Sequence, residues 1–144
     1  RYLQGREAWM TDGAFIERYA PVLGPGVKER FAWSRDVTDA QVEQAQAFRT
    51  RFTTHLRQLL GQDGVLVMPS MPDIAPLRST DEAALEHYRN QAVQMLCIAG
   101  LSGFPQISLP LAGRQGAPLG LSLLGPAGSD RSLIAMAQQL AATA

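Results

Sequence analysis

The sequence predicts an α/β fold in which helices pack on a sheet of at least three strands. Three observations lead to this prediction: an amphipathic helical pattern from about residue 39 to 60, a continuous apolar run at 65–68, and two runs at 105–110 and 119–124 in which apolar and small polar residues alternate. The chain has 144 residues, of which 46% are hydrophobic and 18% charged, which suits one domain with its own core and excludes a disordered tail.

Two helical segments are expected before the long helix. Residues 2–19 favour helix, but the pair Asp12-Gly13 favours a turn, so we expect an interruption there. After a loop rich in glycine and proline, Pro25 suits the first turn of a short helix over 27–33, because a helix leaves the N–H group at that position without a partner.

The long helix has a clear beginning and end. Thr38 and Gln41 have the spacing of a capping box, and Gly61 is a natural stop. Apolar residues spaced three or four apart predict a buried stripe: Val42, Ala45, Phe48, Phe52, Leu56, Leu59 and Leu60.

The run at 65–68 is apolar on both faces, which predicts a strand buried on two sides, followed by a proline-stiffened loop over 69–76. A second capping signature at 79–82 begins a helix that should end near Gly100. Its expected buried residues are Leu85, Tyr88, Ala92, Met95, Leu96 and Ala99.

The two alternating runs are joined by turn-forming residues at 113–117, which predicts an antiparallel hairpin. Within it, Gly120 is expected to allow close approach of a neighbouring segment. Ser129 or Asp130 should cap a final helix. Its expected inward-facing residues are Leu133, Ile134, Ala137 and Leu140.

Charge and cysteine content narrow the class of protein. Thirteen basic and thirteen acidic residues cancel, so neither nucleic acid nor a membrane surface is expected as a partner. Cys97 is the one cysteine and cannot form an internal disulfide, and no apolar run reaches the ~20 residues needed to span a bilayer, so we expect a cytoplasmic location. Because a helical pattern is already present just after Arg1, we interpret residues 1–144 as a single fragment of a longer protein.

Four segments, in order, resemble the amidase signature family. Residues 98–110 are similar to its (A/S)G-apolar-P-x-(I/V)-S-(V/L)-P segment, and 63–70 to its strand that begins after Asp and ends in Pro-Thr. Residues 117–125 resemble its G-(L/A)-P-(V/I)-G-(L/V)-Q-L-(I/V)-G segment, and 130–134 its D-x-x-L-L helix start.

Two positions depart from these patterns: Ser70 stands where threonine is usual, and Ser122 where glutamine is usual. The amino-acid sequences of the first and third segments are most similar to those of the family branch that contains indole-3-acetamide amidases.

The resemblance implies the carboxyl-terminal portion of the amidase signature fold, with helices packed on a mixed β-sheet. The full-length protein would then hydrolyse a small-molecule carboxamide to a carboxylate and ammonia or an amine, through a Ser-Ser-Lys mechanism without a cofactor. The family's Gly/Gly/Ser/Ser loop and its upstream lysine are absent from these residues, and Lys28, beside Glu29 and Arg30, is interpreted as solvated. We therefore expect no catalytic residue here and an inactive fragment that self-associates through apolar surface.

Two other functions stay open at this point. The chain could belong to a non-catalytic interaction domain that keeps the amidase architecture, or to an amidotransferase subunit that acts on aminoacyl-tRNA. Reading the residues upstream of Arg1 for the catalytic loop and lysine would separate the non-catalytic domain from the hydrolase.

The side chains with catalytic potential are given ordinary roles. None of the serines at 70, 102, 108 and 122 lies in a G-x-S-x-G turn, so we interpret them as small packing residues. His55, His87 and Cys97 lack the spacing of a metal site, and Cys97 is interpreted as a small core residue.

Three residues are candidates for substrate binding. Met71 belongs to the loop after the first strand, Phe104 precedes the hairpin, and Trp9 lies in the first helix. We expect them to line the acyl side of the pocket in the parent enzyme, since ligands in open α/β sheets gather where strand-end loops converge. The alternative for Phe104 and Trp9 is that they are core aromatic residues.

Overall fold

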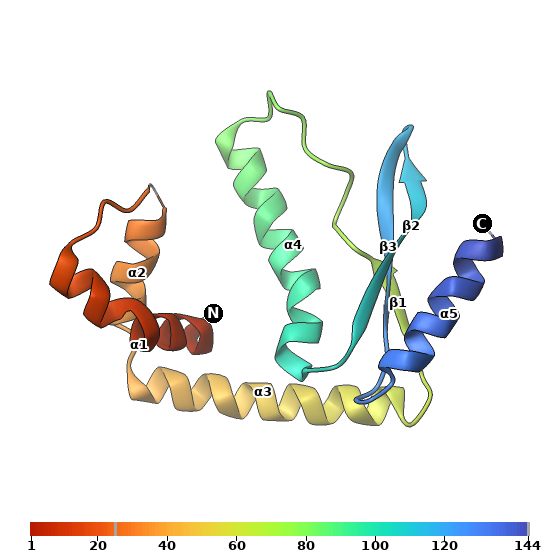
Figure 1. The fold of residues 1–144 in the computed structure, drawn as a ribbon, viewed down its shortest axis with the longest axis horizontal. Helices are drawn as coiled ribbons and strands as arrows, with labels where there is room; N and C mark the ends of the chain where they lie inside the picture. The colour runs from red at the N-terminus through yellow and green to blue at the C-terminus, as the bar shows by residue number, and fades with distance from the viewer. Residues whose placement is uncertain (25, 144) are drawn as a thin grey trace. The chain divides into compact units, whose positions relative to one another are not determined.

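The computed structural model describes residues 1–24 and 26–143, so the prediction for Pro25 lies outside the described residues. They form two compact units, Arg1–Arg51 and Phe52–Ala144, and one long helix runs across the boundary. Figure 1 shows the elements of each unit. In chain order they are α1 (Tyr2–Tyr19), α2 (Val27–Arg35), α3 (Asp39–Leu60), β1 (Leu66–Pro69), α4 (Glu82–Ser102), β2 (Gln106–Arg114), β3 (Ala117–Leu124) and α5 (Asp130–Thr143).

The first helix is continuous, so the expected interruption at Asp12-Gly13 is wrong. Gly13 is buried, and a Cβ atom added there would lie 2.7 Å from the indole ring of Trp9 on the same helix. The glycine therefore provides room for an aromatic side chain one turn earlier, and this packing outweighs its preference for a turn.

Contacts at the amino end of α1 hold the first unit together. The Tyr2 and Trp33 rings are 5.6 Å apart between centroids, and the Arg1 guanidinium lies 5.2 Å from the Trp33 ring centroid. Arg6 also donates to the Asp39 carboxylate at 2.6 Å. These contacts join α1 to α2 and to the first turn of α3.

The second unit contains a three-stranded sheet in the order β1-β3-β2, with antiparallel pairing throughout the described strands. The predicted hairpin is confirmed, since β2 pairs with β3 and the turn residues Gln115 and Gly116 have φ angles of 53° and 79°. In this register Ser122 is opposite Met68 of β1 on one side and Ser108 of β2 on the other. The central position of β3 places its last three residues, Ser122, Leu123 and Leu124, in the core.

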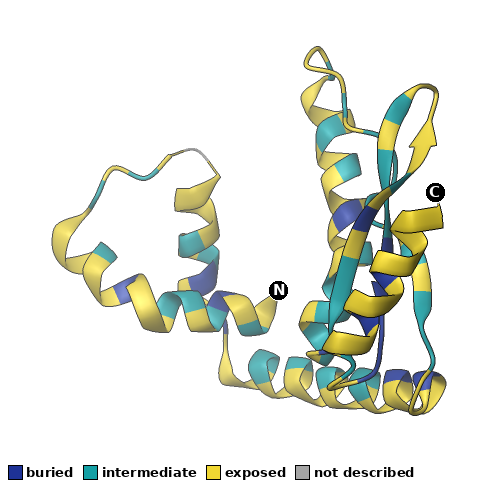
Figure 2. Cartoon of the chain, turned by 45° about the vertical axis from the view of Figure 1, so that its right-hand side comes forward, coloured by how far each residue is buried: buried dark blue, intermediate teal, exposed yellow. Residues whose placement is uncertain are grey.

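The core lies on both faces of the sheet. Leu124 belongs to a cluster with Phe104 and with Leu56 and Leu60 from α3. The adjacent Leu123 belongs to a second cluster with Leu109 and with Leu133 and Ala137 from α5. Neighbouring residues of a strand point to opposite faces, so helices pack on both faces of the one sheet. Figure 2 shows the dark blue of buried residues at the end of β3. The predicted α/β class is confirmed.

Two of the three expected capping interactions form, whereas Ser129 precedes α5 with its Oγ buried and without a hydrogen-bond partner among the described residues. The Thr38 backbone N–H donates to the Gln41 side chain at 2.9 Å, and the Gln41 N–H donates to the Thr38 hydroxyl at 3.3 Å. In the second signature Asp81 is the cap, and its carboxylate accepts from the Ala84 N–H at 2.9 Å. Both long helices of this region therefore begin where the sequence pattern predicts.

Several burial predictions are wrong. Val67 is 56% exposed, because β1 is an edge strand and is not covered on both sides. In α3, Leu56 and Leu60 are buried as expected, whereas Leu59 is 65% exposed. The remaining residues that were expected inside and are exposed are Phe48, Leu96, Ile134 and Leu140.

The fourth helix ends later than predicted. It continues to Ser102, and Gly103, with φ 72°, forms the left-handed cap. Gly100 is accommodated within the helix, and the cap falls on the glycine that precedes the buried Phe104.

A substitution at the centre of the sheet tests the two-layer core. Leu124 has no exposed surface, so Leu124→Ala should lower the free energy of unfolding by about 2–5 kcal/mol through lost burial and the cavity left behind. Leu59→Ala, on the exposed side of α3, is the matched control and should change it by less than about 0.5 kcal/mol. Urea unfolding of the protein that carries this chain measures both, and equal effects would contradict the assigned core.

Candidate functional site

The candidate site is the loop over residues 70–77, which follows β1 and precedes α4. Its first residue is fixed to the sheet, because the Ser70 N–H donates to the Gly120 carbonyl at 2.8 Å. A Cβ atom added at Gly120 would lie 2.6 Å from Ser70 Oγ. The expectation that Gly120 allows a close approach is therefore confirmed, and the segment that approaches is the start of this loop.

Three serine hydroxyls form a network across the sheet. Ser122 Oγ lies 2.8 Å from Ser70 Oγ and 2.8 Å from Ser108 Oγ. Ser122 is fully buried at 0% exposure, whereas Ser108 is exposed. Because Ser122 and Leu124 are two residues apart on one strand, the network shares a sheet face with the cluster that contains α3.

One of the three hydroxyl protons in this network takes no part in its internal hydrogen bonds. Three hydroxyl groups carry three protons, and two of these form the two internal hydrogen bonds. The side-chain hydrogen bonds that the structure describes for these serines join them to one another and to no lysine, histidine or carboxylate. The arrangement can therefore position the loop and donate one hydrogen bond, but it supplies no base to activate a serine as a nucleophile.

Asp73 fixes the middle of the loop through three oxygen atoms. Its Oδ1 accepts from the Ile74 N–H at 2.8 Å, and its Oδ2 lies 2.9 Å from Arg114 Nη1. Its backbone carbonyl accepts from the Tyr88 hydroxyl at 3.1 Å. Arg114 is the last residue of β2 and Tyr88 lies in α4, so this one residue links the loop to the hairpin and to a helix.

The predicted substrate-binding residues lie in different surroundings. Met71 is half-buried in the loop, directly after Ser70. Phe104 is 5% exposed and belongs to the core cluster that contains residues of α3. It precedes Gln106, the first residue of β2, which pairs with Leu124 as does Leu66, the first residue of β1. Phe104 and Met71 thus adjoin opposite ends of the paired strands. Trp9 belongs to the other unit and is half-buried over Gly13.

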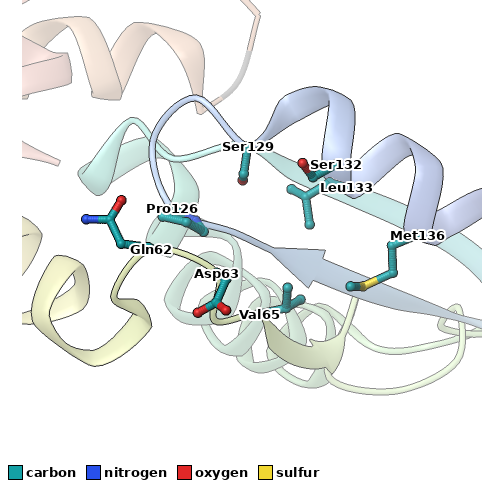
Figure 3. Close-up of a pocket in the computed structure, with 8 residues that line it drawn as sticks. All are labelled: Gln62, Asp63, Val65, Pro126, Ser129, Ser132, Leu133 and Met136. Atoms are coloured by element: carbon teal, nitrogen blue, oxygen red, sulfur yellow. The ribbon is translucent and has the colours of Figure 1, made fainter.

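A separate pocket of about 270 Å³ adjoins the beginning of α5 (Figure 3). Asp63 supplies the charged group among its lining residues, and Ser129 Oγ is a buried atom without a hydrogen-bond partner among the described residues. None of the predicted substrate-binding residues lines it. Its walls consist of Gln62, Asp63, Val65, Pro126, Ser129, Ser132, Leu133 and Met136.

The remaining candidate side chains have local roles. Ser102 Oγ donates to the Ile98 carbonyl at 2.8 Å and accepts from the Phe104 N–H at 3.2 Å, so it closes the end of α4. Cys97 is half-buried, and its thiol donates to the Gln94 carbonyl at 3.2 Å. His55, His87 and Lys28 are exposed.

Neither a metal-binding cluster nor a membrane-spanning helix occurs among the described residues. Over 1–24 and 26–143, no three or more His, Cys, Asp or Glu side chains gather closely enough to hold a metal ion. No helix in that part of the chain is long and apolar enough for a membrane crossing.

Reasoning from the sequence missed the serine network and the contacts of Asp73. The signal for the network was available in part, because Ser108 and Ser122 each occupy a polar position in an alternating run and Ser70 follows a strand. The strand register that brings the three hydroxyls together was not predicted. Asp73 and Arg114 are 41 residues apart, and no local pattern connects them.

The chain belongs to the amidase family, whose profile matches residues 13–134. It is 37% identical to Amidase 1 of Arabidopsis thaliana over 142 residues, which are 99% of this chain and 33% of that protein. It resembles the crystal structure of an amidase with a TM-score of 0.85 at 26% identity, over 96% of this chain and 33% of that one. The chain thus spans about a third of the length of these relatives.

Other relatives have different names. Outer envelope protein 64, chloroplastic, of Arabidopsis thaliana is 30% identical over 96% of this chain and 23% of its own length. A glutamyl-tRNA(Gln) amidotransferase subunit from Streptococcus pneumoniae is 26% identical over 97% of this chain and 30% of its own length. The family likeness of these residues therefore extends over proteins of several kinds.

Paired glycine substitutions test the close approach of the loop to β3. Gly120→Ala should lower the free energy of unfolding by about 1–3 kcal/mol, because the new methyl group would displace Ser70. Gly100→Ala is the matched control, since a Cβ atom there meets nothing within 4 Å inside α4. It should raise stability by about 0.5–1 kcal/mol. Urea midpoints of the two variants should move in opposite directions, and a shift of both in one direction would refute the packing.

Proposed function

We propose that these residues are part of an amidase that hydrolyses a small-molecule carboxamide to a carboxylate and ammonia or an amine. The observation that carries the proposal is the match to the amidase crystal structure, which extends over 96% of this chain at a TM-score of 0.85. A likeness maintained over both units favours a shared scaffold over a similarity confined to one motif.

We further propose that the reacting groups lie outside these 144 residues. By the family resemblance, a serine attacks the amide carbonyl carbon and its proton passes through a second serine to a neutral lysine. The amine leaves with a proton, and water then cleaves the acyl-serine ester to release the carboxylate. Lys28 is exposed, and the serines of the network are bonded to one another, which supports a role for this chain in scaffold and pocket rather than in bond cleavage.

The proposed contribution to the pocket is the acyl side. Met71 is the residue best suited to it, because it is half-buried in a loop that is fixed on either side by Ser70 and Asp73. Phe104 and Trp9 remain part of the proposal. The packing of Phe104 in the core favours a supporting position for it behind the pocket.

Two alternatives have support from particular relatives. Outer envelope protein 64 is named for a location and not for an enzyme activity, which is consistent with the non-catalytic domain, and the relative named as a glutamyl-tRNA(Gln) amidotransferase subunit supports the amidotransferase alternative. A Gly/Gly/Ser/Ser loop with a preceding lysine, encoded upstream of Arg1, would argue against the non-catalytic domain. Glutamine-dependent amidation of a charged tRNA, with no free-amide hydrolysis, would favour the amidotransferase component.

We propose a cytoplasmic location for the hydrolase, on the basis of the single half-buried cysteine.

Hydrolysis of an aryl-acetamide by two proteins tests the proposal. The full-length gene product should release ammonia in a coupled assay, and the isolated 144-residue chain should release none above the buffer rate, since it lacks the nucleophile. Activity in the isolated chain would place the nucleophile within it. An inactive full-length protein whose upstream sequence lacks the serine loop would support the non-catalytic domain instead.

Self-association of the isolated chain is also proposed. Val93 on α4 is 64% exposed and Leu96 is 44% exposed, which leaves an apolar strip on that helix. Light scattering at micromolar concentration should therefore give a mass above the 15.6 kDa of a single chain. Val93→Lys should reduce the apparent mass, and a monomeric wild-type chain would refute the proposal.

A further inference from the structure

Two sets of contacts, called ties below, hold the loop over residues 70–77. One is made by Ser70 and the other by Asp73. The Ser70 hydroxyl contacts the fully buried hydroxyl of Ser122, and the Ser70 N–H donates to the backbone carbonyl of Gly120 in β3. Asp73 contacts the side chains of Arg114 and Tyr88. Met71 and Pro72 are the residues between the two ties, so their position depends on both.

The ion pair of the second tie is exposed to solvent, whereas its Tyr88 hydrogen bond is partly buried. The Asp73 side chain is 43% exposed and that of Arg114 is 56% exposed, with 2.9 Å between Oδ2 and Nη1. Exposed ion pairs contribute little to folding and are weakened by salt. Loss of this pair should therefore loosen the middle of the loop, which the Tyr88 hydroxyl still contacts, without unfolding the sheet, since the core residues make no contact with the pair.

We propose that Asp73 and Arg114 are a positioning pair that sets the place of Met71 and thereby the affinity for amides with a bulky apolar acyl group. The inference rests on the amide hydrolysis proposed above. A thioether side chain offers soft, apolar contact, which suits an aromatic or long aliphatic acyl group more than the single methyl of acetamide. Neither residue of the pair needs to touch the substrate for this effect.

The test uses steady-state kinetics of the full-length protein with an aryl-acetamide and with acetamide. Arg114→Gln and Asp73→Asn should each raise KM for the aryl-acetamide about two- to fivefold and leave kcat unchanged, as expected for an exposed pair. KM for acetamide should not change. The double variant should resemble either single variant, because both remove the same interaction.

Three controls separate positioning from a general structural role. Arg114→Lys keeps the charge and should restore part of the affinity. Arg89→Gln breaks the exposed Glu86–Arg89 contact at 3.7 Å on α4 and should leave KM unchanged. Raising ionic strength from about 0.05 to about 0.5 M should narrow the difference between wild type and Arg114→Gln, because the shorter Debye length weakens the wild-type pair.

Hydrogen exchange reports on the loop independently of turnover. In Arg114→Gln the Ile74 amide, which donates to Asp73 Oδ1, should exchange faster, and the amides of β3 should not. If the wild-type enzyme is active but the variants show unchanged KM and unchanged hydrogen exchange in the loop, the positioning role of the pair is wrong and the proposed function still stands. A full-length protein that carries the serine loop and hydrolyses no amide would overturn the proposed function instead.

Discussion

Burial of β3 from both sides is the constraint on which the rest of residues 52–144 depends. Leu123 and Leu124 are 1% and 0% exposed and point to opposite faces, so each requires its own helix layer. Ser122, beside them, is also fully buried, and a hydroxyl group in that position must have a partner. Ser108 provides one from β2, and Ser70 provides another from the first residue of the loop after β1. The need to satisfy one buried hydroxyl thus connects the core to the loop that we propose as a pocket wall.

The sequence was most informative where a local pattern decides the structure. The capping box at Thr38, the alternation in the hairpin and the small residue at Gly120 each led to a correct prediction, because their effects act over a few residues or one strand spacing. Burial was predicted less well. Val67 and Leu59 are exposed because their surroundings depend on which elements lie beside β1 and α3, and apolar periodicity carries no information about neighbours.

The candidate site was predictable only in outline. The proline-stiffened loop after the first strand was identified from its composition, but its fixed points were not. Ser70, Ser108 and Ser122 are brought together by strand register, and Asp73 meets Arg114 across 41 residues. Such contacts follow from the complete topology. Gly13 is the opposite case, in which a turn signal was outweighed by the packing of the Trp9 ring on the same helix.

The two ties of the loop suggest why a scaffold segment can influence specificity. A buried hydroxyl network with a backbone hydrogen bond holds one end of the loop at a position set by the core, where few alternatives are available. An exposed carboxylate–guanidinium pair holds the middle, where substitutions cost little stability. Under the proposed function, changes at the exposed pair would therefore move a pocket wall while the sheet remains folded. A region to which we assign no nucleophile would in this way tune which acyl group the catalytic centre accepts, because its effect would pass through the position of one loop.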